Sequence, residues 1–175
     1  MPTPPTLQLR HATEAAAAAL GQVHVQAWRE AYAGVIPDAV LAALDPARRT
    51  AMWRDSLARG RVVHLAERHG TLVGFGAGRA QSDASLPYSG EIAAIYVLRC
   101  AQRFGIGRAL MAALARDLLA QGHAGATLWV LEANNPARRF YEALGGTMVA
   151  SREEERDGFR ANGIAYGWPD LTVLT

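Results

Sequence analysis

Two closely spaced glycines occur where an apolar segment gives way to a helical pattern, in the loop Gln102-Arg103-Phe104-Gly105-Ile106-Gly107-Arg108. The first amides of a helix have no intrahelical acceptor, and the helix dipole favours an anion beside them. Glycine lets a bulky diphosphate approach the backbone, and the neighbouring arginines offer charge-assisted hydrogen bonds. The loop therefore indicates a phosphate site. Two glycines before a helix also serve to cap and pack it, and the arginines also fit a solvated surface.

Two familiar phosphate loops do not fit this segment. The dinucleotide-binding fingerprint fails because Leu110 stands where a third glycine or alanine belongs. A Walker A loop is excluded because all 18 basic residues are arginine. The absence of lysine also excludes catalysis through a lysine Schiff base.

A second segment with functional character covers residues 129–146. It consists of an apolar strand, an Asn-x-x-Ala turn at Asn134, a short helix that carries Phe140 and Tyr141, and a glycine at the end. Taken with Gln102-x-x-Gly105-x-Gly107 upstream, it resembles the two acyl-CoA-binding motifs of the GNAT N-acetyltransferase superfamily. The resemblance covers residues 90–146 and is softer on either side.

The resemblance implies a binding site for acetyl-CoA as cosubstrate. The glycine loop would hold the diphosphate, and the strand before it would pair with the pantetheine arm, which requires the sheet to splay there, for example at a bulge. Asn134 would hydrogen-bond pantetheine, cap the helix that begins near Pro136, or do both. The cofactor residues implied in this way are Ile95, Tyr96, Val97, Gln102, Arg103, Phe104, Gly105, Ile106, Gly107, Arg108 and Asn134.

The resemblance also implies two catalytic side chains. Presenting a primary amine in its neutral form at pH 7 costs about 4 to 5 kcal/mol, so a base is useful. Glu91 is expected to be that base, directly or through water, and the alternative is an exposed glutamate at a strand end. Tyr141 is expected to protonate the departing CoA thiolate, although its helical spacing also fits a core tyrosine.

The residues that bind the amine acceptor are expected on the first helix, at Trp28 and Tyr32. These residues lie four apart on one helical face, which fits substrate binding and core packing equally well. The acceptor is an amine of a small molecule or a peptide, and its identity stays open. The C-terminal stretch 166–170 fits closure of the pocket or the edge of a homodimer. A non-catalytic acyl-CoA-binding sensor or regulatory domain is the alternative function.

Composition narrows the remaining classes of fold, partner and location. The chain has 175 residues, half of them hydrophobic, which predicts a single domain over 1–175. A formal net charge of +2 argues against a nucleic-acid partner, and no apolar run is long enough to span a membrane. The one cysteine, Cys100, gives no disulfide, so the cytoplasm is the expected location. The five histidines show no metal-ligand spacing, so no metal is expected.

The pattern of apolar residues predicts the elements that position these motifs. Strands are expected at 7–10, 61–67, 71–76, 91–98, 126–131, 147–151 and 164–168, and helices at 13–32, 38–44, 46–58, 105–119 and 136–144. The expected fold class is α/β (α+β), the GNAT fold. Its central sheet is mixed, largely antiparallel and twisted, with about six or seven strands, helices on its faces and splayed strands at the acyl-CoA site.

Overall fold

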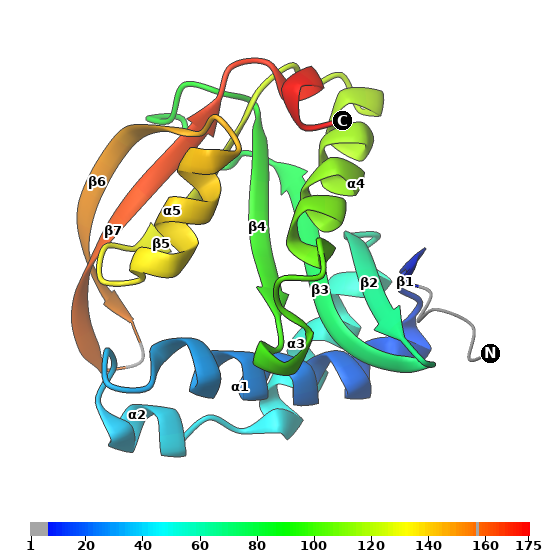
Figure 1. Ribbon diagram of the computed structural model, residues 1–175. Coiled ribbons are helices and arrows are strands. Elements are labelled where there is room, and N and C mark those ends of the chain that lie inside the picture. Colours follow the sequence, from blue (N-terminus) through cyan, green and yellow to red (C-terminus); the bar gives the residue numbers. More distant parts are fainter. Residues whose placement is uncertain (1–6, 157) are drawn as a thin grey trace.

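A single sheet with helices on both faces forms the centre of the protein, as the computed structural model of residues 7–156 and 158–175 shows (Figure 1). Residues 1–6, which the expected domain includes, lie outside the described residues. The strands are β1 (Leu7–His11), β2 (Val62–Arg68), β3 (Thr71–Ala80), β4 (Gly90–Val97), β5 (Ala126–Leu131), β6 (Thr147–Arg156) and β7 (Phe159–Trp168). The α-helices are α1 (Ala17–Tyr32), α2 (Asp38–Ala42), α3 (Pro46–Ala58), α4 (Ile106–Ala120) and α5 (Asn135–Ala143).

The order of the strands is β1-β2-β3-β4-β5-β7-β6. All neighbouring pairs are antiparallel except β4 and β5, which are parallel. This confirms the expected mixed, largely antiparallel sheet. Because β7 is paired on both sides, Tyr166 to Trp168 lie inside the sheet, and this part of the C-terminal stretch is not an edge strand.

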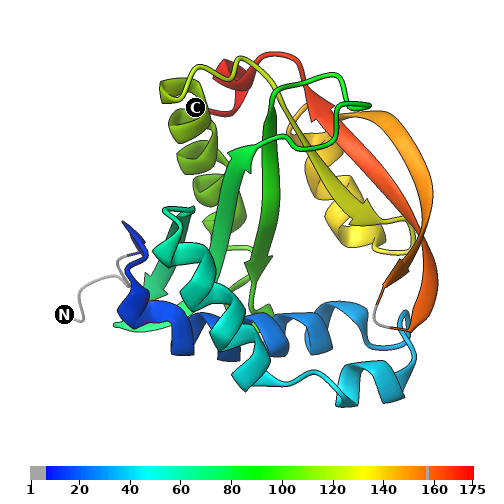
Figure 2. The ribbon, with the colours of Figure 1, turned by 180° about the vertical axis from the view of Figure 1, so that it is seen from behind.

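The sheet splays between β4 and β5. These strands pair only at Gly90↔Ala126 and Glu91↔Thr127. On the other side of β4 the register passes from Ile92↔Gly78 to Ala94↔Ala77, so Ala93 is the extra residue of a bulge. Figure 2 shows the two strands separating from this end of the sheet toward the other. The splay that the family resemblance implies is present, and a bulge accompanies it.

Glycines in β3 let α4 lie close to the sheet. A Cβ atom added to Gly76 would lie 2.8 Å from Leu114 Cδ1, closer than side chains pack. Leu110, Leu114 and Leu118 of α4 are fully buried on this face, which α5 also covers. Helices α1 and α3 cover the opposite face (Figure 2), where the core includes Trp53.

The predicted cap of α3 is confirmed, whereas the predicted bounds of the last two strands are wrong. Asp45 caps α3 as expected, because its Oδ1 accepts a hydrogen bond of 2.8 Å from the amide of Ala47. The expected bounds of the last two strands are wrong, since β6 extends to residue 156 and β7 begins at 159. The added residues form a charged hairpin at the edge of the sheet, where backbone pairing does not require an apolar face, so the apolar pattern ends before the strands do.

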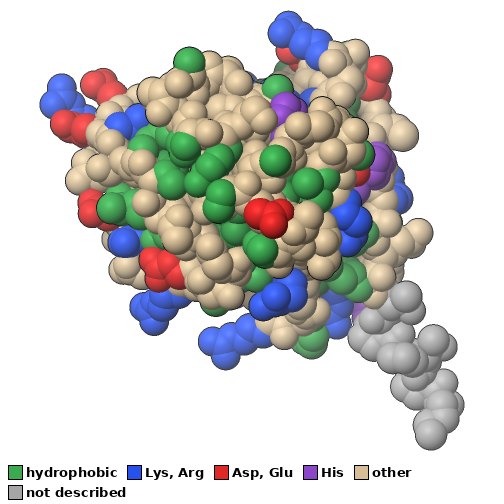
Figure 3. Space-filling view, turned by 90° about the horizontal axis from the view of Figure 1, so that it is seen from above, with side chains coloured by type: hydrophobic (Ala, Val, Ile, Leu, Met, Phe, Trp, Pro, Cys, Tyr) green, Lys and Arg blue, Asp and Glu red, His purple; other side chains and the backbone are tan. Residues whose placement is uncertain are grey.

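On the face seen in Figure 3, arginine side chains are spread around the rim and do not form a continuous basic stripe.

Among the described helices, none combines the length and the apolar composition that crossing a membrane requires.

Candidate functional site

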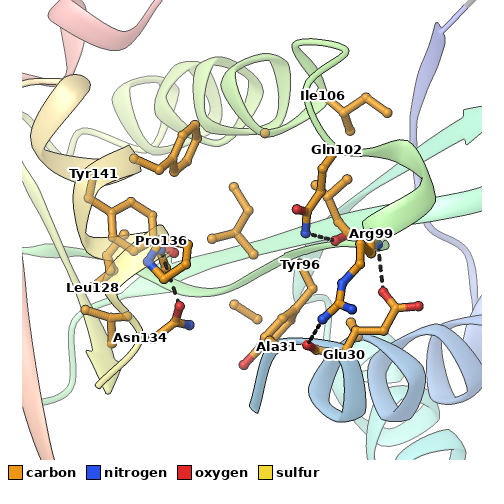
Figure 4. A pocket seen from close by; sticks show the side chains of 18 of the residues that line it. Glu30, Ala31, Tyr96, Arg99, Gln102, Ile106, Leu128, Asn134, Pro136 and Tyr141 are labelled. Carbon is orange, nitrogen blue, oxygen red and sulfur yellow. Dashed lines mark hydrogen bonds between the residues drawn. The ribbon is translucent and has the colours of Figure 1, made fainter. Parts of the chain in front are cut away.

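A cavity of about 640 Å³ lies where β4 and β5 diverge. Its walls come from the end of α1, from β4 and β5, and from the segments that begin α4 and α5. Figure 4 shows Gln102, Arg99 and Ile106 on one side, and Tyr141, Asn134 and Leu128 on the other. The sequence-predicted residues that line it are Tyr32, Ile95, Tyr96, Val97, Gln102, Arg103, Gly105, Ile106, Gly107, Arg108, Asn134 and Tyr141.

The glycine loop and the first residues of α4 line the cavity, and the backbone of the loop has an unusual conformation. Gly105 precedes the helix with φ of +77°, a left-handed conformation that glycine adopts without strain. Arg103 also has a positive φ, of +67°. The side-chain amide of Gln102 donates to the carbonyl of Val97 at 3.1 Å and so ties the loop to the end of β4. The start of α4 thus lies at the cavity with its backbone amides available, which is the arrangement that the predicted anion site requires.

Phe104 is the one predicted loop residue that does not line the cavity. It is 61% exposed, and the guanidinium of Arg68 lies 4.0 Å from the centre of its ring. The side chain therefore covers the outer surface of the loop, stacked on a cation from β2.

The two sequence motifs meet inside the fold. A Cβ atom on Gly107 would lie 3.0 Å from Phe140 Cζ, so the missing side chain lets α5 lie against the start of α4. Asn134 Oδ1 accepts a hydrogen bond of 3.3 Å from the amide of Ala137, which confirms its capping role. Asn134 also lines the cavity, and its role in binding the cofactor stays a prediction.

Tyr141 lies on the buried face of α5. Its ring packs against Phe140, Tyr166 and Trp168. Burial raises the pKa of Tyr141 strongly, and the nearby Tyr32 raises it further. The phenol therefore stays protonated over the whole neutral range, as a hydrogen-bond donor requires.

Hydrogen bonds to β7 hold α5 in this orientation. The hydroxyl of Tyr166 donates to Glu142 Oε1 at 2.5 Å and accepts from Arg138 Nε at 3.2 Å. Both partners belong to α5, so this helix cannot rotate about its axis without breaking these bonds.

Trp28 contributes to the site through a neighbour. It does not line the cavity, and its indole N–H donates to the Tyr96 hydroxyl at 2.9 Å. The ring of Tyr32, which does line the cavity, lies edge-on to Trp28 with centroids 5.1 Å apart. Burial raises the pKa of Tyr96 well above its usual value, and Tyr32 adds to this. The structure therefore places Trp28 behind the cavity wall, where it orients Tyr96.

Glu91 is buried, as its place in an apolar strand suggests, but it is not alone. Its carboxylate receives two hydrogen bonds from Arg79 of β3, at 2.5 and 3.0 Å. This contact raises the pKa of Arg79. Glu91 is not among the residues that line the cavity, although Ile92 beside it is. The structure therefore does not bring Glu91 and Tyr141 to one wall.

The sequence pattern did not indicate Glu30 and Arg99, which also line the cavity. Glu30 Oε2 accepts a hydrogen bond of 2.7 Å from the amide of Arg99, and Arg99 Nη2 donates to the Glu30 carbonyl at 2.7 Å (Figure 4). The pair joins α1 to the start of the glycine loop. In the sequence Glu30 has the pattern of a solvated helix residue, and only the tertiary fold brings the two together.

Comparison with known proteins agrees with this geometry. A family model described as the Acetyltransferase (GNAT) family matches residues 24–146. The uncharacterized N-acetyltransferase YuaI of Bacillus subtilis (strain 168) is 36% identical over 155 residues, which is 89% of this chain and 88% of that protein.

Solved structures share the fold. The yncA protein of Salmonella typhimurium, solved with its cofactor acetyl-CoA, has a TM-score of 0.71 at 20% identity and covers 95% of this chain and 94% of its own. The paia N-acetyltransferase of Thermoplasma acidophilum, in complex with coenzyme A, has a TM-score of 0.72 at 18% identity and covers 91% and 98%. The matched motifs, the splayed sheet and the cavity lead to one conclusion: the chain belongs to the GNAT acetyltransferase family.

Proposed function

We propose that the protein transfers an acetyl group from acetyl-CoA to a primary amine by direct attack. One observation carries this proposal: the cavity between the splayed strands is lined by the first residues of α4 at one side and by Tyr141, whose pKa burial raises, at the other. The family membership and the relatives solved with acetyl-CoA or coenzyme A support the same cosubstrate.

The cosubstrate fits the cavity in three parts. The diphosphate lies at the amides that follow Gly105, where the helix dipole favours an anion. The pantetheine arm pairs with the backbone of residues 95–97, because the register between β4 and β5 ends at Glu91↔Thr127 and leaves this edge of β4 to a ligand. Asn134 at the start of α5 hydrogen-bonds the arm from the opposite side. The thioester then lies near Tyr141.

The transfer begins when the neutral amine attacks the thioester carbon. A new C–N bond forms, the C–S bond breaks, and the sulfur leaves with the electron pair. The hydroxyl of Tyr141 donates a hydrogen bond to the departing thiolate, and the thiolate takes up a proton from solvent once it has left. Because burial raises the pKa of Tyr141, its main contribution is to stabilise the developing charge on sulfur while staying protonated.

The proton that the amine loses needs another acceptor. Glu91 lies outside the cavity wall and is held by Arg79, so we assign it the water-mediated form of the base role. Water next to the bulge at Ala93 would carry the proton from the amine toward the Glu91 carboxylate. This step is separate from the Tyr141 step and is tested separately.

The experiment that tests the function measures release of free CoA from acetyl-CoA with a panel of amines. The panel contains polyamines, aminoglycosides, peptides with a free N-terminus and a lysine-rich protein, and binding of acetyl-CoA is measured in parallel. Release above background with at least one amine is the expected result. An acyl-CoA sensor would bind the cofactor and release none with any acceptor.

A further inference from the structure

Three potential metal ligands, His11, His64 and Asp117, meet at a place that the acetyl-transfer site does not use. They come from β1, β2 and α4, and none of them lines the acyl-CoA cavity. Their ligand atoms all lie within 4.8 Å of one another. The sequence indicated no metal because the three residues are far apart along the chain and only the fold assembles them.

The sheet register explains why the two histidines face each other. His11 and His64 are directly opposed in the antiparallel pairing of β1 and β2, so their side chains point to the same face. Their rings meet edge to face, with centroids 4.3 Å apart. This cross-strand pair supplies two imidazole nitrogens on the same face of the sheet.

The close approach of α4 supplies the third ligand. His64 is opposite Gly76 in the register of β2 and β3. Because Gly76 has no side chain, Leu114 of α4 lies against the strand there. Asp117 follows Leu114 by three residues and so occupies the same face of the helix. Its carboxylate is thereby brought to the two imidazoles.

The distances are close to those that a tetrahedral ion requires. His64 Nε2 lies 2.6 Å and His11 Nε2 lies 3.7 Å from Asp117 Oδ2. Two ligands bound at 2.0–2.1 Å to one zinc ion in tetrahedral geometry are about 3.3 to 3.4 Å apart. The first distance must open by about 0.7 to 0.8 Å and the second must close by about 0.3 to 0.4 Å. The two imidazole nitrogens, which lie within 4.8 Å of each other, must reach the same separation. Rotation of the more exposed His11 and Asp117 side chains permits these changes.

We propose that His11, His64 and Asp117 form a zinc site. Two imidazoles and one carboxylate are ligands that zinc prefers, and solvent supplies the fourth position. The His64 side chain is 8% exposed and that of Asp117 27%, whereas that of His11 is 64% exposed and leaves a path for the ion to enter. The ion links the edge strand β1 to α4 and stabilises the fold. It takes no part in acetyl transfer.

The test uses protein without a histidine tag, treated with a chelator and dialysed. Titration calorimetry with zinc chloride measures affinity and stoichiometry, and thermal unfolding is recorded with and without zinc. We expect one ion per chain, a dissociation constant in the micromolar range or below, and a higher Tm with zinc. Co²⁺ in the same site gives the visible absorption of a four-coordinate ion.

Three variants make the assignment specific. His11→Gln alters an exposed side chain, and Asp117→Asn keeps an oxygen that accepts a hydrogen bond from His64, so both are designed to fold. Each is expected to weaken zinc binding about tenfold or more. His69→Gln, at an exposed turn between β2 and β3, is the matched control and keeps full affinity. The proposal is overturned if the natural chain shows no saturable zinc binding, or if His11→Gln binds zinc as tightly as His69→Gln.

Discussion

Glu91 and Arg79 lie opposite each other in the register of β3 and β4 and are joined by two hydrogen bonds. The pair is asymmetric, because the Glu91 side chain is 11% exposed and that of Arg79 is 40% exposed. A buried charge that loses its partner is penalised more than a charge that water can reach. The two residues therefore contribute differently to stability.

Removing Arg79 is expected to destabilise the fold more than removing the charge of Glu91. Arg79→Gln leaves a buried carboxylate without its cation and lowers the free energy of unfolding by about 1 to 3 kcal/mol. Glu91→Gln leaves an arginine that solvent can reach, and its effect is smaller. Urea denaturation of both variants at neutral pH measures the difference, and an equal or reversed order would contradict the asymmetry.

The proposed role of Glu91 as a proton acceptor predicts an effect on rate and on its pH dependence. A base acts when deprotonated, so kcat/KM rises with pH through the range in which the base loses its proton. Glu91→Gln is expected to flatten this rise and to lower kcat by roughly 10²-fold. Glu67→Gln is the matched control, since it breaks a similar ion pair with Arg10 on another strand. If the pH profile of Glu91→Gln keeps its shape, another group or bulk water accepts the proton.

Tyr141→Phe tests the other half of the mechanism. Removing the hydroxyl removes the hydrogen bond to the leaving thiolate, so kcat is expected to fall by roughly 10²-fold while the affinity for acetyl-CoA changes little. Steady-state kinetics and calorimetric binding of acetyl-CoA give the two quantities. Tyr88→Phe, at a tyrosine outside the cavity, serves as the control and retains the natural rate. An unchanged kcat in Tyr141→Phe would remove this residue from the proposed mechanism.

The raised pKa of Tyr141 also predicts how stability depends on pH. Because the pKa of Tyr141 is higher in the folded chain than in the unfolded one, its ionisation does not affect the free energy of unfolding below the ordinary tyrosine pKa of 10.0, and it lowers that free energy as the pH rises above this value. Each such tyrosine lowers the free energy of unfolding by about 1.4 kcal/mol per pH unit in that range. Tyr141→Phe is therefore expected to resist alkaline unfolding better than the natural chain, as measured by denaturation between about pH 9 and pH 11. Parallel curves for the two proteins would contradict it.

The features that the sequence predicts are those that depend on neighbours along the chain. Gly105 and Asn134 belong to local motifs with a fixed spacing, whereas the splay beside β4 was expected only from the family resemblance and the bulge has no signal in the sequence. The contact of Glu30 with Arg99 depends on how α1 crosses the sheet, which no local pattern reports.

The pairing of Glu91 with Arg79 is another feature that the sequence alone does not predict. A charge in an apolar strand indicates that the residue has a partner or a function, but the partner is set by the register between β3 and β4. A shift of one residue in that register would place Arg79 on the opposite face. The sequence therefore predicts that Glu91 is unusual and does not predict Arg79.

Substitutions at two glycines, one at each end of α4, distinguish a role of the loop in binding from an effect of backbone strain alone. Gly105 and Gly122 have φ values of +77° and +89°, and an added Cβ atom would meet nothing within 4 Å at either position. Alanine in this conformation costs roughly 1 to 2 kcal/mol, so both substitutions are expected to lower stability by similar amounts. Only Gly105→Ala should also weaken acetyl-CoA binding, by about tenfold, because relief of the strain turns the first amides of α4 away from the diphosphate. Calorimetry with acetyl-CoA at a temperature where both variants are folded distinguishes them, and equal affinities would show that the loop does not hold the cofactor in the proposed way.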